Sequence, residues 1–413
     1  MERSATLPDP SVTAVRATDN AALQSFAALV MADAALAADL AAIEDPGAFV
    51  ARAMQSAAAH DIAIPEASLV TATQPDPLSL ARWSTPLLAG SALPPRDWLP
   101  IAAAAAAGSI AVDWARFGPQ PLRGPFYEAD IRRALSLPFN RAFRYRTGLA
   151  DLIAQADKMA SVAPAGFIFH MSRCGSTLLA QMLAALDDSI VISEAAPLDA
   201  VVQLGRKLAP GDAARALRAM ILALGRRRSG RERRYVVKLD CWHTLALPTF
   251  RRAFPDVPWV FLYRDPVEVL VSQMRQRGMQ MVPQFLPPGL YGIDAVTVRA
   301  PDEDYCARVL AAVCRAALDQ RRLGGGLFVN YRDLPGAVAT TILPHFGLSC
   351  SDAEGAILRR AALMNAKSPG MAFAPDAEAK RRAATDAIRA AADRHLGEIF
   401  DRLEASSRQL NTA

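Results

Sequence analysis

From residue 166 onward, short apolar runs alternate with longer stretches in which apolar residues recur every three or four positions. Short apolar runs are typical of buried parallel strands, and the longer periodic stretches are typical of helices that cover a sheet. The pattern predicts a three-layer α/β fold in which helices flank a parallel sheet. The predicted strands are Phe167–His170, Ile190–Ser193, Tyr235–Leu239, Trp259–Tyr263 and Leu327–Asn330. The predicted helices lie near 176–186, 212–228, 267–277, 303–322, 352–364 and 377–404.

The first 150 residues show a different pattern. Residues 21–59 are rich in alanine with few helix breakers, and Leu99–Phe117 continues in the same way. This pattern predicts an α-helical N-terminal unit over 1–150, followed by the α/β domain over 151–413. Gly124–Phe143 concentrates aromatic and arginine side chains, which form either a docking surface for the second unit or one wall of a substrate cleft. Docking is favoured, because aromatic side chains pack more often than they bind ligands.

The composition is that of a globular protein with a large core. Apolar residues make up 52% of the 413 positions and charged residues 21%, which excludes disorder as the dominant state. The chain exceeds the size at which one core stops growing, so two structural units are expected. The net charge is only +5, so any anion site must come from local clustering of basic groups.

The cysteine pattern and the hydropathy of the chain indicate the cellular compartment in which the protein is expected. The five cysteines show no CxxC spacing, which favours reduced thiols over a disulfide framework or a zinc site and implies no metal. The N-terminal residues lack a secretory pattern, and the most apolar stretch, Leu99–Val112, is too short to span a bilayer. The sequence therefore predicts a cytoplasmic protein with no membrane association. Its richness in alanine and arginine is typical of proteins from GC-rich bacterial genomes.

A candidate phosphate site follows the first predicted strand, in the segment Met171-Ser-Arg-Cys-Gly-Ser-Thr-Leu-Leu179. Gly175 allows a tight turn, and the first N–H groups of the following helix, at Ser176 and Thr177, favour an anion. Arg173 adds a positive charge. The GxxxxGKS/T spacing of nucleoside triphosphatases is absent, so their lysine and magnesium-binding hydroxyl are not in their usual places. The alternative is an ordinary helix N-cap without a ligand.

A second candidate anion site follows the strand Trp259–Tyr263. Arg264 stands at the strand's carboxyl end and Ser272 two helical turns later, so one phosphate can be held by both side chains. Asp265, Pro266 and Glu268 have the pattern of an N-cap, a first-turn proline and a capping-box acid. The alternative is that Arg264 only pairs with a nearby acidic residue.

The two motifs, in this order, resemble the family of sulfotransferases that use 3′-phosphoadenosine 5′-phosphosulfate (PAPS). In that family a strand is followed by Lys or Arg, Ser or Cys, Gly, Ser or Thr, Thr and Leu, and this loop binds the 5′-phosphosulfate. Arg173 matches the basic position, and Cys174 stands where serine is more usual. Arg264 and Ser272 match the pair that binds the 3′-phosphate. The resemblance implies a P-loop-type sulfotransferase fold with PAPS as co-substrate and PAP as product, without a metal.

Weaker matches extend the resemblance to the rest of the donor site. Tyr331, in the turn Asn330–Leu334, matches a tyrosine that touches the adenine, although a packing role is equally consistent with its position. Lys367 lies in a late loop where relatives add cationic contacts to the 3′-phosphate.

The catalytic groups implied by the resemblance lie after the second and third strands. Lys238 resembles the strand lysine that contacts the sulfuryl group, and with Arg173 it would stabilise charge in the transition state. Glu194 matches the catalytic glutamate of tyrosylprotein and some carbohydrate sulfotransferases and is the favoured base. His243 is the rival, although its spacing from the strand lysine is five residues instead of two. Asp240 is a minor candidate.

The basic run 226–234 holds six arginines in nine residues. We interpret it as a solvated helix end, because arginines complement the dipole at a helix C-terminus and no aromatic platform for nucleic acid accompanies them. A subsidiary hypothesis is that the run attracts an acidic acceptor.

The sequence thus predicts a sulfotransferase that moves a sulfuryl group from PAPS to a hydroxyl or amine. The acceptor is a small molecule, a carbohydrate or a peptide, selected by the N-terminal unit and the loop Met279–Ala300; nucleic acid is not expected as a partner. The alternatives are a P-loop kinase that uses ATP and Mg²⁺, and a noncatalytic nucleotide-binding protein. The oligomeric state is open.

Overall fold

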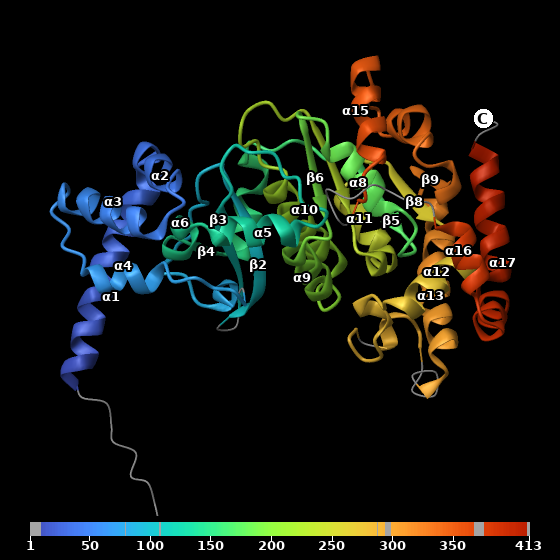
Figure 1. Cartoon of the computed structure of the whole chain (residues 1–413), viewed down its shortest axis with the longest axis horizontal. Helices are drawn as coiled ribbons and strands as arrows, with labels where there is room; N and C mark the ends of the chain where they lie inside the picture. Colours follow the sequence, from blue (N-terminus) through green and yellow to red (C-terminus); the bar gives the residue numbers. More distant parts are fainter. Residues whose placement is uncertain are drawn as a thin grey trace, which may run out of the picture. The chain divides into compact units, whose positions relative to one another are not determined.

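The computed structural model describes residues 10–78, 80–106, 109–286, 288–293, 299–366 and 376–410 (Figure 1). The chain divides into two compact units. The first comprises Met1–Gln120 with Ala129–Lys158, and the second comprises Pro121–Glu128 with Met159–Ala413.

The second unit is built on a five-stranded sheet in which all neighbouring strands run parallel. All five predicted strands are confirmed, each to within one residue at either end. In chain order they are β5 (Gly166–His170), β6 (Ser189–Ser193), β7 (Arg234–Lys238), β8 (Trp259–Tyr263) and β9 (Gly326–Asn330). The spatial order is β6-β7-β5-β8-β9.

The strand order places a crevice at the centre of the sheet. The chain leaves β5 toward β6 and β7 on one side and then crosses to β8 and β9 on the other. In doubly wound sheets, ligands bind beyond the carboxyl ends of the strands where the order reverses. The segments that follow β5, β7 and β8 should therefore border a binding site.

Helices surround this sheet, as predicted (Figure 1). The predicted helix 377–404 is two helices, α16 (Ala377–Ala383) and α17 (Asp386–Leu410), and α17 packs against α12 (Pro266–Arg275) and α13 (Asp302–Asp319). Among the described residues, three α-helices of this unit were not predicted, α9 (Ala196–Gly205), α11 (Leu247–Ala253) and the single turn α14 (Leu343–His345). The others are α8 (Ser176–Ala184), α10 (Pro210–Leu224), α12 (Pro266–Arg275), α13 (Asp302–Asp319), α15 (Asp352–Ala362), α16 (Ala377–Ala383) and α17 (Asp386–Leu410).

The core of the second unit explains why its strands read as continuous apolar runs. Strands β5, β6 and β8 are buried along their whole length. Phe167 and Phe169 of β5 pack edge to face against Phe250 of α11, and Phe169 also contacts Trp259 of β8. A strand covered on both faces has no solvent-facing positions, so its sequence does not alternate.

The first unit is not purely helical, so that prediction was wrong. Its helices are α1 (Pro10–Ala32), α2 (Ala34–Ala41), α3 (Pro46–Ala58), α4 (Glu66–Ala72), α6 (Pro138–Ala142), α7 (Leu149–Gln155) and most of α5 (Tyr127–Ser136). They accompany a four-stranded sheet of order β1-β4-β3-β2, formed by β1 (Leu88–Ala89), β2 (Trp98–Ala106), β3 (Ser109–Arg116) and β4 (Tyr145–Gly148).

The alanine-rich segment that suggested a helix forms the antiparallel pair β2 and β3. Pro100 and the pairing with β3 account for the difference between the predicted helix and the observed strands. Pro100 cannot donate in a helix, and the register of the pair shifts between Pro100 and Ala102. Pairing with β3, whose Val112 and Trp114 are fully buried, overrides the helix propensity of alanine.

Two aromatic residues of 124–143, Phe139 and Phe143, belong to the first unit and pack inside it. Phe139 and Phe143 lie 5.3 Å apart, centre to centre, and Phe143 also contacts Phe26 and Phe49. All four rings are buried. Phe139 and Phe143 therefore belong to the core of their own unit, and the predicted docking of the segment against the second unit stays a prediction.

The arginine run 226–234 is a folded turn, and its interpretation as a solvated helix end was wrong for two of its members. Arg226 and Arg228 are buried. The carboxylate of Glu232 accepts hydrogen bonds from the backbone N–H groups of Arg228, Ser229 and Gly230. The sequence pattern did not reveal that this acidic residue organises the turn.

Among the described residues, no single helix has the length and apolarity of a membrane span. One pair, Ala21–Ala32 with Ala34–Ala41, reaches them together, but its halves are bent by 107°.

Candidate functional site

A cleft of about 580 Å³ opens at the carboxyl ends of the strands in the second unit. Its walls include the residue positions just after four strands, namely Ser172 after β5, Glu194 after β6, Asp240 after β7 and Arg264 after β8. The cleft also contains the predicted donor-site residues Arg173, Cys174, Gly175, Ser176, Thr177, Ser272 and Tyr331. The topology therefore brings both candidate anion sites to one cavity.

The loop between β5 and α8 holds its shape through left-handed backbone. Ser172, Arg173 and Gly175 have φ angles of 80°, 52° and 85°. A side chain at Gly175 would place its Cβ 2.5 Å from the Tyr331 ring, so glycine is required both by φ and by space. The loop delivers the chain into the N-terminus of α8 at Ser176, where free N–H groups and the helix dipole favour an anion.

Hydrogen bonds from side chains hold the same loop in place. The Ser172 hydroxyl accepts hydrogen bonds from the amides of Gln273 and Gln280, at 3.1 and 2.9 Å. The N–H of Ser172 donates to Nδ1 of His170, which leaves the ring proton on Nε2 to donate to the Leu239 carbonyl at 2.8 Å. Burial lowers the pKa of His170, in keeping with a neutral packed ring.

Cys174 lines the cleft, but its thiol is turned toward β8, which explains how cysteine replaces the more usual serine. Its thiol donates to the carbonyl of Leu262 on β8 at 3.2 Å and is fully buried. Burial raises the pKa of this thiol to about 11, so it stays protonated at neutral pH. The substitution therefore removes no side-chain donor from the loop.

Arg264 lines the cleft and is also paired with acidic side chains, so phosphate binding by this residue stays a prediction. Its Nε donates to Glu268 at 2.6 Å and its Nη2 to Asp376 at 2.9 Å. Burial alone would lower the pKa of Arg264, but the hydrogen bonds to Asp376 and Glu268 outweigh it and raise the pKa. The guanidinium stacks on the Tyr331 ring at 4.1 Å.

The start of α12 agrees with the prediction for Asp265 but not with the prediction for Glu268. Asp265 caps the helix by accepting from the N–H groups of Val267 and Glu268. The predicted capping-box role of Glu268 was wrong, because its carboxylate binds Arg264 and Arg381 instead. Glu268 is nearly fully buried, so it pairs with these cations instead of folding back on the backbone.

The C-terminal helices add a cation that sequence reasoning missed. Lys380 of α16 is buried, lines the cleft and donates to Asp376 at 2.7 Å. Asp376 thus joins two cations, Arg264 and Lys380. Ser272 lines the same end of the cleft. The predicted Lys367 lies outside the described residues.

Glu194 and Lys238 form an ion pair, which the sequence did not predict. Glu194 has a left-handed backbone, with φ at 51°, and its N–H donates to the Lys238 carbonyl. Its Oε1 accepts a short hydrogen bond from Lys238 Nζ and lies 3.5 Å from His170 Nε2. Burial would raise the pKa of Glu194, but the ammonium of Lys238 and the His170 ring outweigh it and lower the pKa to about 2.

Lys238 itself is fully buried and does not line the cleft. Its ammonium lies 5.0 Å from the centre of the Phe126 ring, which does line the cleft. The predicted contact between Lys238 and a sulfuryl group therefore requires the pair with Glu194 to open.

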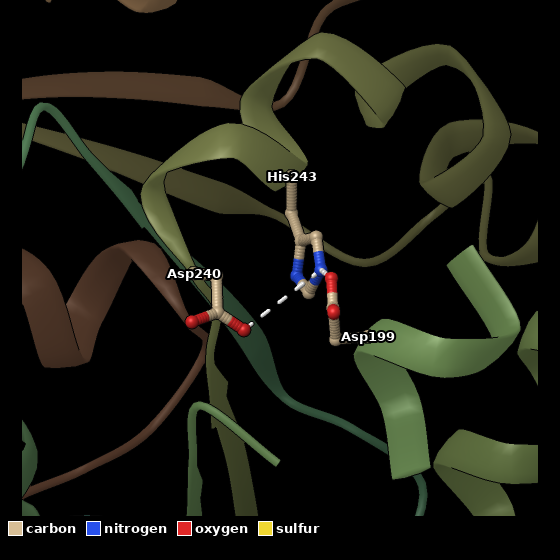
Figure 2. Close-up of side chains that lie close together, drawn as sticks. All are labelled: Asp199, Asp240 and His243. Atoms are coloured by element: carbon tan, nitrogen blue, oxygen red, sulfur yellow. Dashed lines mark hydrogen bonds and ion pairs between the residues drawn. The ribbon is translucent and has the colours of Figure 1, made fainter. Parts of the chain in front are cut away.

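His243 belongs to a cluster beside the cleft (Figure 2). Its Nε2 lies 2.8 Å from Asp199 Oδ1 and 3.8 Å from Asp240 Oδ2, and its Nδ1 is buried without a partner. Asp199 comes from α9, whereas Asp240 and His243 come from the segment after β7. His243 does not line the cleft, but Asp240 does.

The three ligand atoms of this cluster lie within 4.8 Å of one another, a spacing that a divalent cation can bridge. However, Asp199 Oδ1 already accepts hydrogen bonds from Trp242 Nε1 at 2.7 Å and from Gln203 Nε2 at 3.1 Å, in addition to the His243 contact. An oxygen with three such partners is satisfied by the protein itself. The cluster is therefore a hydrogen-bonded network.

Comparison with known proteins gives a likeness of fold only. No protein-family model matches the sequence, and no curated protein matches it. Among solved structures, the chain is similar to the sulfotransferase domain of an olefin synthase from Synechococcus PCC 7002, at 17% identity and a TM-score of 0.35, over 61% of this chain and 97% of that one.

Two other sulfotransferases are similar to a comparable degree. One, from Alicyclobacillus acidocaldarius, is 17% identical with a TM-score of 0.33, over 60% of this chain and 96% of that one. The other, from mouse and complexed with PAP, is 10% identical with a TM-score of 0.33, over 63% of this chain and 93% of that one. All three TM-scores are below 0.5, so function has to be argued from the residues of this chain.

Proposed function

We propose that this protein is a sulfotransferase that moves the sulfuryl group of PAPS to a hydroxyl or amine acceptor and releases PAP. The observation that supports this best is that the residues of two separate candidate anion sites line one cleft. The phosphate loop ends at Ser176 after β5, and Arg264 with Ser272 follows the neighbouring strand β8. A nucleotide with phosphate groups at both its 3′ and 5′ positions needs such a pair.

The cleft also has the size and lining of a nucleotide site. A volume of about 580 Å³ lies within the usual range of ligand pockets, about 300–1,000 Å³. Tyr331 and Trp242 offer aromatic surfaces, and Tyr331 sits between the two anion sites. An adenine contact for Tyr331 stays a prediction.

In the proposed reaction the protein positions the reactants and stabilises charge. The acceptor oxygen or nitrogen attacks sulfur in line with the bridging oxygen, which leaves on the 5′-phosphate of PAP. The N–H groups at Ser176 and Thr177 and the guanidinium of Arg173 are placed to stabilise charge on that phosphate. Arg173 donates from Nη2 to the Gln276 carbonyl at 2.6 Å, which orients its side chain along the cleft.

The proposal is tested by calorimetric titration with PAP in the absence of added metal, with ATP·Mg²⁺ and AMP titrated in parallel. PAP should bind much more tightly than either of the other nucleotides. Arg264→Ala should weaken PAP binding strongly, because it removes a partly desolvated cation. Arg275→Ala is the matched control, since Arg275 is on the same helix but exposed and outside the cleft.

The outcomes separate the candidate classes. Binding of ATP·Mg²⁺ without PAP would favour a kinase, and binding of none of the three would favour a role that does not involve nucleotides. If PAP binds, incubation with ³⁵S-labelled PAPS and a panel of phenols, alcohols, amines and sugars identifies the acceptor class.

A further inference from the structure

Three groups near the phosphate loop can in principle accept a proton from the acceptor, and their surroundings differ. Glu194 is held by the fully buried ammonium of Lys238 and by His170. A carboxylate so stabilised gives up this interaction if it takes a proton. Glu194 is therefore a weak base that instead keeps a buried lysine charged and compensated.

His243 is the second group, and it lies behind the wall of the cleft. It is 1% exposed, and its Nε2 is already engaged by Asp199. Burial would lower the pKa of His243, but the hydrogen bond to Asp199 and the charge of Asp240 raise it overall. A buried histidine whose Nε2 already contacts Asp199 and which does not line the cavity is out of reach of the acceptor.

Asp240 is the third group, and it alone combines contact with the cleft and a proton affinity matched to neutral pH. It lines the cavity beside Cys241 and Trp242 and is 8% exposed. Burial raises the pKa of Asp240 to about 7, and the carboxylates of Glu194 and Asp199 act in the same direction. A general base works best when its pKa lies near the working pH.

All the ionisable groups around Asp240 bear on this balance. His243 and Lys238 oppose the rise in the pKa of Asp240. The cysteine and tyrosine that couple to it, Cys241 and Tyr291, have raised pKa values because of burial and so are neutral. The net effect leaves Asp240 as the carboxyl group whose charge changes near pH 7.

We propose that Asp240 is the catalytic base of the cleft, and that His243 and Asp199 are positioning residues that set its charge and orientation. This inference rests on the proposed sulfotransferase function. In the step, the acceptor oxygen forms a bond to sulfur while the bond from sulfur to the bridging oxygen breaks. The bonding electron pair leaves on the 5′-phosphate of PAP, and the acceptor proton passes to a carboxylate oxygen of Asp240.

The test compares Asp240→Asn with Glu194→Gln in three measurements. The first is PAP affinity by calorimetry, which both variants should retain within about twofold because neither side chain is assigned to phosphate. If wild-type protein does not bind PAP, the proposed function fails, whatever the other results show.

The second measurement is turnover with labelled PAPS and the acceptor found by the panel. Asp240→Asn should lower kcat/KM by about 10²–10⁴-fold, the usual contribution of a general base. For wild type, kcat/KM should rise with pH through about 7, as Asp240 ionises. Turnover of Asp240→Asn within threefold of wild type would overturn the proposal, as would loss of turnover in folded, PAP-binding Glu194→Gln alone.

His243→Gln provides the readout for a positioning role. Removing this neighbouring imidazole should move the midpoint of the pH–rate profile upward, because His243 lowers the pKa of Asp240. A purely structural role would lower the rate without moving the midpoint. An unchanged midpoint would therefore remove His243 from the proposal.

The third measurement needs no acceptor and decides the case if the panel finds none. It is the difference in Tm between Asp240→Asn and wild type from pH 4.5 to 8. The folded-state pKa of Asp240 is raised, so the wild type loses stability as pH rises from about 4 to about 7. The variant should therefore gain Tm relative to wild type over this window, with a constant difference above it. Parallel Tm curves across the whole range would overturn the assignment.

Discussion

The two candidate anion sites of the cleft are built in opposite ways. The phosphate loop uses backbone N–H groups at the start of α8, held by left-handed residues and by buried glutamines. The Arg264 site uses charged side chains, and its cations are already paired with Glu268 and Asp376. If the proposed function holds, the first site can accept an anion as it stands, whereas Arg264 in the second must exchange partners to bind a phosphate.

The largest effect should come from the backbone-built site. Gly175→Ala forces a side chain into left-handed backbone and against the Tyr331 ring. Several N–H donors would then move away from the phosphate together, each contributing about 0.5–1.5 kcal/mol. We expect a loss of PAP affinity of at least about 100-fold by calorimetry. Gly211→Ala is the control, because a Cβ there meets nothing and the site is far along the chain in α10; an equal loss there would contradict the reasoning.

The second largest effect is expected when the guanidinium of Arg264 is replaced by an ammonium. Arg264→Lys keeps a positive charge but cannot stack on Tyr331 or contact two partners with one planar group. Charge-assisted hydrogen bonds contribute about 1.5–3 kcal/mol, so PAP affinity should fall by about 10–100-fold. Calorimetric affinity within twofold of wild type would show that Arg264 serves Glu268 and Asp376 alone.

A smaller effect of opposite sign is expected at Asp376. Asp376→Asn removes a negative charge that competes with phosphate for Arg264 and Lys380. Because the Asp376 side chain is 45% exposed, screening limits the gain to about threefold tighter PAP binding. The gain should shrink at high salt. Glu378→Gln is the control. Glu378 lies in α16 and pairs with the exposed Arg382, so its replacement should leave PAP affinity unchanged.

The smallest effect is expected at Cys174. Cys174→Ser should change PAP affinity by less than about twofold, since the side chain points to the Leu262 carbonyl and a hydroxyl can make the same hydrogen bond. A gain of tenfold would mean that this side chain turns toward the ligand after all.

Much of the second unit could be predicted from the sequence, because its strands are buried on both faces and so appear as short apolar runs. The loop around Gly175 and the arginine after β8 were found because the residues of each site are close in sequence. The strands β2 and β3 were missed because their pairing, not their alanine content, determines their structure.

The charge partners were harder to predict, because they come from distant segments. Asp199 meets His243 across 44 residues, and Asp376 meets Arg264 across 112. No spacing rule connects such residues in a single sequence. The ion pair of Glu194 with Lys238 joins two residues that were predicted separately, and their opposite charges were the only available hint.

The Tyr331 ring lies between Gly175 and Arg264 in the cleft. The ring fills the space beside Gly175 and carries the guanidinium of Arg264 on its face. One rigid six-membered ring therefore sets the separation between the loop at Gly175 and the guanidinium of Arg264. Under the proposed function, replacing it with a smaller side chain would let that separation vary, and the cleft should then distinguish less sharply between nucleotides that carry their second phosphate at different positions of the sugar.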